Sequence, residues 1–529
     1  MGTARDPQPQ QQAGGGRDRR WPALAVCLTA GFMTLLDVSI VNVALPSIRT
    51  GIGASQSGLQ WVLSGYALTF GLALVPAGRL GDVRSRRAVF MAGLVFFTAT
   101  SALAGAAQNE TWLIGARLLQ GAAGGVLVPQ VSGFIQQMFR GAERGRAFGL
   151  LGATIGVSTA VGPLLGGLLI QAFGTHDGWR WVFYVNLPIG LAALPLAYRL
   201  LPAPPGREDK GGRKHSDLDP VGVLLLGVGT VVLLLPFVQE EQWKGPLKWL
   251  LVPTGLLILA GFTGWERRYA HRHESLVDLE LFRQRSYGLG VLLSLLYFAG
   301  FTAVFFILTL YLQNGKHYSA LEAGLSIMPF ALGSGAAAAV GGRMATRVGR
   351  PLVAAGLATV VVGLLGTALA AHLDGGQSVG WATAGPLLVA GIGSGLVIAP
   401  NQTLTLSNVP VARAGSAGGV LQTAQRIGSA AGIAAVGSVF FSRIDARHAD
   451  WAGGFQLGLV TATGLAALAL VVALVDIFGG RSARSPSGDG GSEDGASAVG
   501  SSADGPARSD TSTDTPADRD RRAASADEH

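Results

Sequence analysis

Residues 78–109, GRLGDVRSRRAVFMAGLVFFTATSALAGAAQN, place a short basic cluster directly before 22 residues that carry no charge. A helix needs about 20 mostly apolar residues to cross the hydrocarbon of a bilayer. Similar uncharged stretches recur at residues 50–78, 118–139, 147–176 and 286–315. The pattern predicts a membrane protein and excludes a soluble enzyme of several domains.

The composition agrees with this prediction. Only 14% of the 529 residues are charged and 49% are apolar, whereas roughly 25% of the residues in an average soluble protein are charged. The single cysteine, Cys27, excludes a disulfide framework and a cysteine-based metal site. The net charge of +8 would suit a nucleic-acid-binding protein, but the basic residues lie in short loops between apolar runs. We therefore expect the lipid bilayer as a partner and no nucleic acid.

Fourteen stretches are long and apolar enough to span a bilayer. The first is too long for a signal peptide, and Asp37 interrupts it where a signal peptide would be purely apolar. We predict an all-α integral membrane protein whose fourteen transmembrane helices lie near residues 22–46, 59–77, 88–107, 111–131, 147–170, 181–201, 220–239, 247–265, 287–312, 321–342, 351–371, 382–402, 416–440 and 454–478.

The distribution of basic residues predicts the orientation. Of the 40 Lys and Arg residues, 25 lie in the amino-terminal tail and in every second loop, and seven lie in the alternate loops. Cytoplasmic loops carry the excess of Lys and Arg. We therefore expect a multi-pass protein of the plasma membrane with both termini in the cytoplasm. Residues 479–529 are rich in Ser, Gly and Asp and lack an apolar run, which predicts a disordered cytoplasmic tail.

An internal repeat predicts how the helices are grouped. The motif GRLGDVRSRR at residues 78–87 has a counterpart, GRMATRVGR, at residues 342–350, offset by 264 residues. A chance match between such short segments is the alternative. Two parallel repeats with a substrate path between them are a transporter architecture. The predicted parts are an amino-terminal tail (1–20), a six-helix bundle (21–201), two inserted helices with their flanking loops (202–285), a second six-helix bundle (286–478) and the tail (479–529).

Two charged side chains inside the predicted spans need a compensating function. Placing Asp37 or Arg117 in a membrane helix costs about 2.5 to 3.5 kcal/mol on insertion scales. Both lie roughly 10 Å below the outer surface at the helical rise per residue, so they can pair. Burial favours the protonated form of a carboxyl group and a nearby guanidinium favours its charged form. The pair therefore predicts a proton-binding site, with a purely structural ion pair as the alternative.

The fifth predicted span is rich in small residues, which let membrane helices approach closely. We expect a tight, leak-resistant contact between the two halves at this helix, and generic small-residue packing is an equally weighted alternative. The residues concerned are Gly149, Ser158, Gly162, Pro163, Gly166 and Gly167.

The loop at residues 78–87 combines one acid with several arginines. Contacts between arginine and carboxylate at a cytoplasmic mouth can hold two helix ends together and release them when the mouth opens. A solvated cluster that only sets the topology is the more common alternative, and the repeat at Gly342 favours the latch. The predicted latch residues are Gly78, Asp82, Arg86 and Arg87.

A cavity for a drug-sized compound would be mostly apolar and aromatic with a few polar groups. An aromatic stripe on the ninth span could instead face lipid or a neighbouring helix. The candidate cavity residues are Asn42, Gln120, Asn186, Tyr297, Phe301, Phe305, Gln422 and Arg426. The sequence shows no phosphate-binding motif, catalytic triad or metal-ligand cluster, so we expect no enzyme, no ATP-driven pump, no metal and no cofactor.

These motifs resemble the major facilitator superfamily and, within it, the fourteen-helix drug:proton antiporter branch. Residues 36–46 (LDVSIVNVALP) and 179–190 (WRWVFYVNLPIG) resemble that branch's first-helix motif and its sixth-helix entry. Residues 78–87 resemble the superfamily's loop motif, and residues 117–121 (RLLQG) its fourth-helix motif with a proton-coupling arginine. Residues 149–167 (GLLGATIGVSTAVGPLLGG) resemble the fifth-helix antiporter motif, which symporters generally lack. Ser85 and Ser158 replace glycines of these motifs, and both are small.

The resemblance implies efflux of a hydrophobic or amphipathic drug in exchange for protons, by alternating access and as a monomer. Protons would be the coupling ion. Because the spans hold one deep acid, Asp37, and two bases, Arg117 and Arg426, we predict a neutral or weakly anionic aromatic substrate such as an antibiotic. The bias to Ala, Gly and Arg resembles antibiotic-producing actinobacteria. A proton-coupled transporter of a nutrient or siderophore is the nearer alternative, and a receptor or scaffold is the second.

Overall fold

The computed structural model describes residues 17–202, 219–238, 243, 245–271, 273, 275–374, 376, 378–446 and 450–482. The predicted tails therefore lie almost wholly outside the described residues. The described residues form helices and no β-strand, and a helix covers each of the fourteen predicted spans. The long helices are α1 (Arg17–Ile52), α2 (Gln56–Val83), α3 (Arg86–Gly105), α4 (Glu110–Met138), α5 (Gly141–Phe173), α6 (Gly178–Tyr184) with α7 (Asn186–Leu200), α8 (Pro220–Val238), α9 (Leu251–Tyr269), α10 (Arg285–Leu310), α11 (Ala320–Val348), α12 (Arg350–Leu373), α13 (Val379–Thr405), α14 (Ala414–Ala446) and α15 (Trp451–Ser482).

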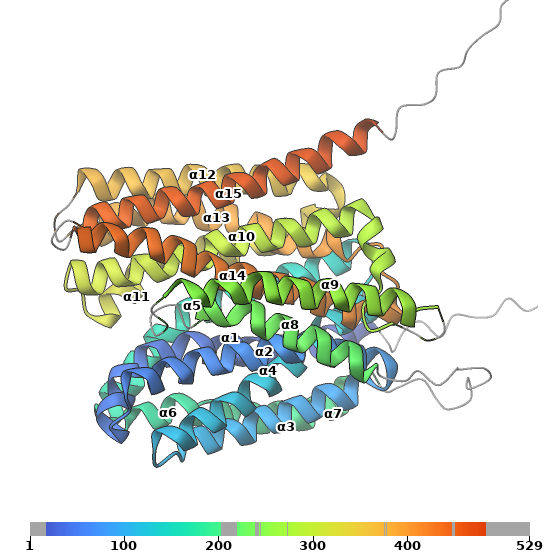
Figure 1. Cartoon of the computed structure of the whole chain (residues 1–529), viewed down its shortest axis with the longest axis horizontal. Coiled ribbons are helices and arrows are strands. Elements are labelled where there is room, and N and C mark those ends of the chain that lie inside the picture. Colours follow the sequence, from blue (N-terminus) through green and yellow to red (C-terminus); the bar gives the residue numbers. More distant parts are fainter. Residues whose placement is uncertain are drawn as a thin grey trace, which may run out of the picture. The chain divides into compact units, whose positions relative to one another are not determined.

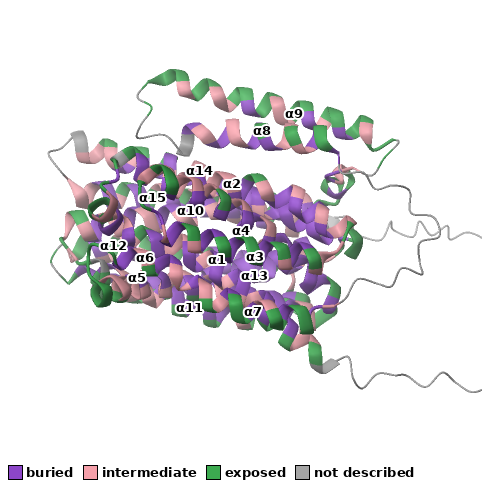
Figure 2. Ribbon diagram, turned by 90° about the horizontal axis from the view of Figure 1, so that it is seen from below, coloured by how far each residue is buried: buried purple, intermediate pink, exposed green. Residues whose placement is uncertain are grey.

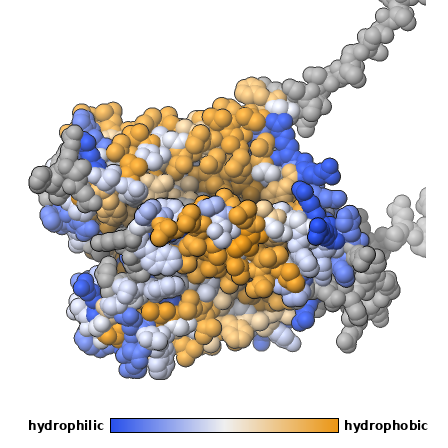
Figure 3. All heavy atoms as spheres, in the orientation of Figure 1, coloured by the Kyte–Doolittle hydropathy of each residue, from blue (hydrophilic) through white to orange (hydrophobic). Residues whose placement is uncertain are grey.

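The fold is that of a membrane protein. Within the described residues, thirteen helical segments are long and apolar enough to cross a bilayer, and the apolar part of α8, Pro220–Pro236, is somewhat shorter. Figure 3 shows a broad apolar band across one face, with hydrophilic residues gathered at both ends of the helices. This pattern matches a hydrocarbon layer bounded by water on two sides.

Several helix ends differ from the predicted ones. Helix α1 extends beyond its predicted span at both ends and contains Pro22 and Pro46, which neighbouring groups make tolerable in a membrane helix. The sixth predicted span consists of two helices, because α6 ends at Tyr184 and α7 begins at Asn186. Pro188 lacks the N–H that would donate to the carbonyl of Tyr184, four residues earlier. The break therefore falls directly before Asn186.

The helices form two halves and a separate pair. Helices α1 to α7 pack together, as do α10 to α15, and the halves meet where α2 packs along α14 and α5 along α11. Helices α8 and α9 pack against each other and, through α8, on α2 and α14. Figure 1 shows this pair in front of the two halves, and Figure 2 shows it to one side of them. We call the end where α1 begins and α15 ends the terminal face, and the opposite end the far face.

Glycines let the two halves approach closely near the terminal face. A Cβ atom on Gly78 of α2 would lie 2.3 Å from the carbonyl oxygen of Gly415 on α14. A Cβ atom on Gly342 of α11, the repeat counterpart of Gly78, would lie 2.2 Å from the carbonyl oxygen of Gly145 on α5. No side chain fits at such distances from backbone, so the corresponding position in each repeat must be glycine for this contact to form.

Candidate functional site

The structure brings Asp37 of α1 and Arg117 of α4 together inside the amino-terminal half. Nη1 of Arg117 donates to Oδ2 of Asp37 at 2.6 Å. The exposed fractions of the two side chains are 0% and 1%. A buried ion pair is retained only where further hydrogen bonds satisfy its remaining polar atoms.

Three polar side chains surround this pair. Nε2 of Gln120 donates to Oδ1 of Asp37 at 2.9 Å, and Nδ2 of Asn186 approaches the same oxygen at 3.4 Å. Both amides also donate to Oγ of Ser101, at 3.1 and 3.0 Å. Gln120 and Asn186, which we predicted to line the substrate cavity, are therefore buried partners of Asp37. The break between α6 and α7 places Asn186 at this position.

The guanidinium of Arg117 is held from its other sides as well. Its Nε donates to the carbonyl of Val62 at 3.1 Å, and its Nη1 also donates to Oε1 of Gln120 at 2.8 Å. The ring of Tyr66 lies 4.2 Å below the guanidinium carbon. Arg117 therefore has several partners besides Asp37.

Aromatic rings connect this network to the other half. Tyr66 and Phe70, one turn apart on α2, stack with ring centroids 5.8 Å apart. Arg426 of α14 lies over the opposite ring, with its guanidinium carbon 4.3 Å from the centroid of Phe70. Arg117 and Arg426 thus stand at the two ends of one pair of rings. The sequence analysis missed Tyr66 and Phe70. The one feature of the sequence that could have indicated them is their spacing of four residues, which places both rings on one face of a helix.

Asp82 joins the two halves at the terminal face. Its carboxylate accepts hydrogen bonds from the backbone N–H groups of Gly415 and Ser416, at 2.9 and 2.8 Å, and from Oγ of Ser416 at 3.1 Å. These groups begin α14, so the acid meets the positive end of a helix dipole. Arg86 binds the same carboxylate at 2.7 Å and donates to the carbonyl of Val411.

Arg87, another residue of the predicted latch, joins two helix ends within the amino-terminal half. It donates to the carbonyl of Tyr198 on α7 and lies over that ring, 4.7 Å from the centroid. Helix α3 directs Arg86 and Arg87 to different sides, because consecutive residues on a helix do not share a face. The repeat counterpart of Arg86, Arg350, pairs with Asp476 of α15 at 2.7 Å, so the two repeats use this position differently.

The small residues of α5 face two different neighbours. Gly149 packs on α11, where an added Cβ would lie 2.8 Å from the carbonyl oxygen of Ala338. Gly162 and Gly166 pack instead on Ser39 and Ile40 of α1. Oγ of Ser39 also donates to the carbonyl of the buried Ser158 at 3.1 Å.

The predicted contact between the halves is therefore present at Gly149 and again at Pro163, which meets α11, whereas Gly162 and Gly166 pack within the amino-terminal half. A Cβ on Gly167 would meet no atom within 4 Å, and the ring of Pro163 lies 3.5 Å from a Cβ placed on Gly324. The motif holds α5 against α1 two residues from Asp37 and, at Gly149 and Pro163, against the opposite half.

The family comparison agrees with this arrangement. The model of the Major Facilitator Superfamily matches residues 27–433. The chain belongs to the major facilitator superfamily. It is therefore a multi-pass membrane transporter and not an enzyme.

Relatives within the major facilitator superfamily are similar along most of their length. A probable actinorhodin transporter of Streptomyces coelicolor is 36% identical over 84% of this chain and 75% of its own. A tetracenomycin C resistance and export protein of Streptomyces glaucescens is 32% identical over 83% of this chain and 80% of its own. The human organic anion transporter MFSD10 superposes with a TM-score of 0.61 at 16% identity, over 86% of this chain and 99% of that one. This last likeness shows the fold alone.

The remaining cavity candidates of this transporter lie on both sides of the contact between the halves. Phe301 and Phe305 of α10 line a narrow apolar hollow together with Phe330 of α11 and Ile155 of α5. Tyr297 is buried behind them, with its ring centroid 5.6 Å from that of Phe301. The aromatic stripe therefore faces the other half at Phe301 and Phe305 and the protein core at Tyr297.

The polar candidates differ in their surroundings. Asn42 is exposed and donates only to the carbonyl of Val38 in its own helix, among the described residues. Gln422 and Arg426, one turn apart on α14, are both half-buried. Arg426 has no ion pair or hydrogen bond with any residue that the structure describes. It is thus a cation between the halves that no carboxylate in the described part of the chain pairs with.

Proposed function

We propose that this transporter exports a hydrophobic or amphipathic antibiotic-like compound in exchange for protons and thereby confers resistance. The observation that carries the proposal is the buried pair of Asp37 and Arg117 within its hydrogen-bond network. Intramembrane ionisable residues with a named partner mark ion pathways and proton relays. The relatives named as an actinorhodin transporter and a tetracenomycin C export protein support the class of cargo.

In the proposed cycle, Asp37 binds one proton in the state open to the outside. Protonation converts its carboxylate into a neutral acid and ends the ion pair with Arg117, whose guanidinium keeps its bonds to Val62 and Gln120. When the cavity opens to the cytoplasm, the proton leaves and the ion pair forms again. A membrane potential supplies about 2.3 kcal/mol per charge per 100 mV for this inward step.

Alternating access in this proposal uses the contacts at the terminal face. The bonds from Asp82 to α14, and the close approach of α5 and α11, hold that face closed. We assign the terminal face to the cytoplasm, because most of the basic loop residues lie there. Release of Asp82 from α14 would let the two halves separate and expose the cavity to the cytoplasm. Each chain contains both halves, so the unit of transport is a monomer.

The proposed substrate is neutral or weakly anionic and aromatic. The aromatic rings of Phe301 and Phe305 offer a surface for an aromatic body, and the hollow beside them, about 10 Å³ here, would widen as the halves move apart. The unbalanced cation of Arg426 favours a neutral or acidic group over a second positive charge. If ethidium were exported far better than a neutral antibiotic of similar size, this assignment would be wrong.

A growth assay tests the proposed function. A drug-sensitive host carrying the gene should grow at higher concentrations of one or more antibiotics than the host without it. Cells carrying the gene should also accumulate less of the drug, and a proton uncoupler or the substitution Asp37→Asn should each raise accumulation to the level of the host without the gene. Uptake of a nutrient or siderophore, with no protection by the gene against any member of the panel, would instead support the nearer alternative.

A further inference from the structure

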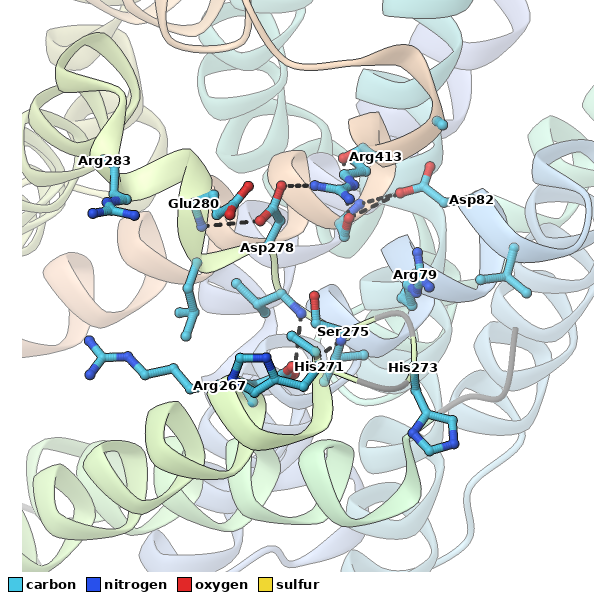
Figure 4. A pocket seen from close by; sticks show the side chains of 18 residues that line it. Arg79, Asp82, Arg267, His271, His273, Ser275, Asp278, Glu280, Arg283 and Arg413 are labelled. Carbon is cyan, nitrogen blue, oxygen red and sulfur yellow. Dashed lines mark hydrogen bonds and ion pairs between the residues drawn. The ribbon is translucent and has the colours of Figure 1, made fainter. Parts of the chain in front are cut away.

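A second hollow, of about 940 Å³, lies at the terminal face outside the proton site. Three parts of the chain enclose it: the end of α2, the connection from α9 through the short helix η3 (Leu279–Arg283), and the segment that leads into α14. Figure 4 shows the side chains from these parts turned toward one space. The inserted helices thus form a pocket with the region around Asp82 and Ser416.

The acidic side chains of this hollow are largely occupied by bonds within the protein. Asp82 binds the start of α14. Oε1 of the buried Glu266 accepts from the backbone N–H groups of Leu276 and Val277, at 3.0 and 3.3 Å. Asp278 binds Arg413. These three carboxylates therefore have little capacity left to attract a cation, and the fourth acid of the lining, Glu280, is exposed and has no side-chain bond with a described residue.

Two of the arginines that line the hollow have no such bonds, whereas Arg413 binds Asp278. Arg267 at the end of α9 and Arg283 of η3 are both exposed, and neither has an ion pair or hydrogen bond with a described residue. The imidazole of His271 likewise has no such bond within the described chain. Figure 4 places Arg267 and Arg283 on the same side of the hollow. Two free guanidinium groups with parallel donors suit an anion with several acceptor oxygens, and phosphate is the group that arginine binds best in this manner.

The hollow also lies at the level expected of lipid headgroups. The rings of Trp265, Tyr269 and His273 form a ladder along the end of α9, with successive centroids 6.2 and 4.6 Å apart. Trp and Tyr concentrate at membrane–water interfaces. Nearer the beginning of the same helix, Leu256 and Leu257 are 54% and 72% exposed. Figure 2 shows that much of α9 is not covered by other helices. A lipid lying along α9 would bring its phosphate to the mouth of the hollow.

We propose that Arg267 and Arg283 bind the phosphate group of an anionic ligand in this hollow. The apolar face of α9 favours the headgroup of an anionic phospholipid as its source, and a soluble phosphate ester from the aqueous side carries the same chemistry. Arg267 belongs to the inserted pair and Arg283 to the segment that leads into α10, so the bound phosphate would hold the inserted helices against the carboxy-terminal half. The binding site itself does not depend on proton-coupled export.

Native mass spectrometry of the full chain tests this site. The protein is exchanged into equal mixtures of phosphatidylglycerol and phosphatidylcholine, and the retained lipid is counted. We expect selective retention of phosphatidylglycerol, and roughly 30-fold weaker retention after the double substitution Arg267→Gln and Arg283→Gln. The control Arg268→Gln with Arg347→Gln removes the same charge from exposed residues that do not line the hollow, and it should retain the lipid.

A soluble phosphate ester and the lipid selectivity decide between the remaining outcomes. If glycerol 3-phosphate raises the melting temperature as much as phosphatidylglycerol does, and the double variant loses both effects, the site takes a soluble ester and the phosphate chemistry stands. Equal retention of both lipids by the unmodified protein, or undiminished retention by the double variant, would overturn the proposal. The melting temperatures of the lipid-free double variant and control show whether each has folded.

Discussion

Replacing Asp82 with Asn tests whether the terminal face is held closed by this carboxylate. Three hydrogen bonds connect it to the other half, from N–H of Gly415, N–H of Ser416 and Oγ of Ser416. The bond to Arg86 stays within the amino-terminal half and survives opening. Asparagine keeps one acceptor oxygen, but its NH2 group replaces the other oxygen and faces a backbone N–H, so one of these hydrogen bonds cannot form.

The expected change follows from the loss of one charge-assisted bond. Hydrogen bonds to charged groups contribute about 1.5 to 3 kcal/mol each, and every 1.4 kcal/mol changes an equilibrium constant roughly tenfold. Asp82→Asn should therefore move the equilibrium between the closed and the open terminal face by roughly 10- to 150-fold toward the open form. The loss of the favourable charge at the start of α14 acts in the same direction.

Distances between two spin labels measure this change. In a Cys27→Ala background, labels replace the exposed residues Arg84 on the amino-terminal half and Arg347 on the carboxy-terminal half. We expect Asp82→Asn to populate a longer distance. Arg87→Gln is the matched control, because the hydrogen bond of Arg87 to Tyr198 lies within the amino-terminal half. An unchanged distribution in Asp82→Asn, or an equal shift in the control, would refute the latch.

Three further predictions address the contact between the halves, the substrate and the proton network. Gly342→Ala places a Cβ 2.2 Å from the carbonyl oxygen of Gly145, so it should cost the closed form about 1 to 3 kcal/mol and lengthen the same spin-label distance; an unaltered distance would show that the contact is dispensable. Arg426→Gln should reduce transport of an acidic aromatic drug roughly tenfold more than that of a neutral analogue, and equal losses would remove Arg426 from substrate recognition. Gln120→Leu deletes a donor to Asp37 and should shift the pH dependence of transport, whereas a change in protein yield without such a shift would assign Gln120 a structural role only.

The spans and the intramembrane pair could be predicted because both depend on the free-energy cost of placing individual residues in water or in the membrane. An uncharged run of about 20 residues must avoid water, and Asp37 and Arg117 are each too costly in a membrane helix to stand alone. Matched depth along two helices was sufficient to pair them. The superfamily motifs added the expectation of transport, which the family comparison confirms.

The other partners of the pair depend on tertiary packing that no local pattern contains. Gln120 and Asn186 were expected in a cavity because they are polar residues in apolar helices. Their burial beside Asp37 follows from the direction of α4 and from the break before α7. No sequence pattern indicated that Ser101 would bind both amides. The partner of Asp82 could not be found for the same reason, because Ser416 lies 334 residues away in the other half.

The central claim is that protonation of Asp37 couples the inward movement of protons to export. Its most direct test uses the purified protein in vesicles and an antibiotic that the growth assay identifies as a substrate. The experiment measures antibiotic accumulation driven by an imposed pH gradient, and exchange of labelled for unlabelled antibiotic without a gradient. The account predicts that Asp37→Asn abolishes the first and retains the second, while Asp177→Asn, at an exposed acid between α5 and α6, retains both. Accumulation by Asp37→Asn at the level of the unmodified protein would contradict it.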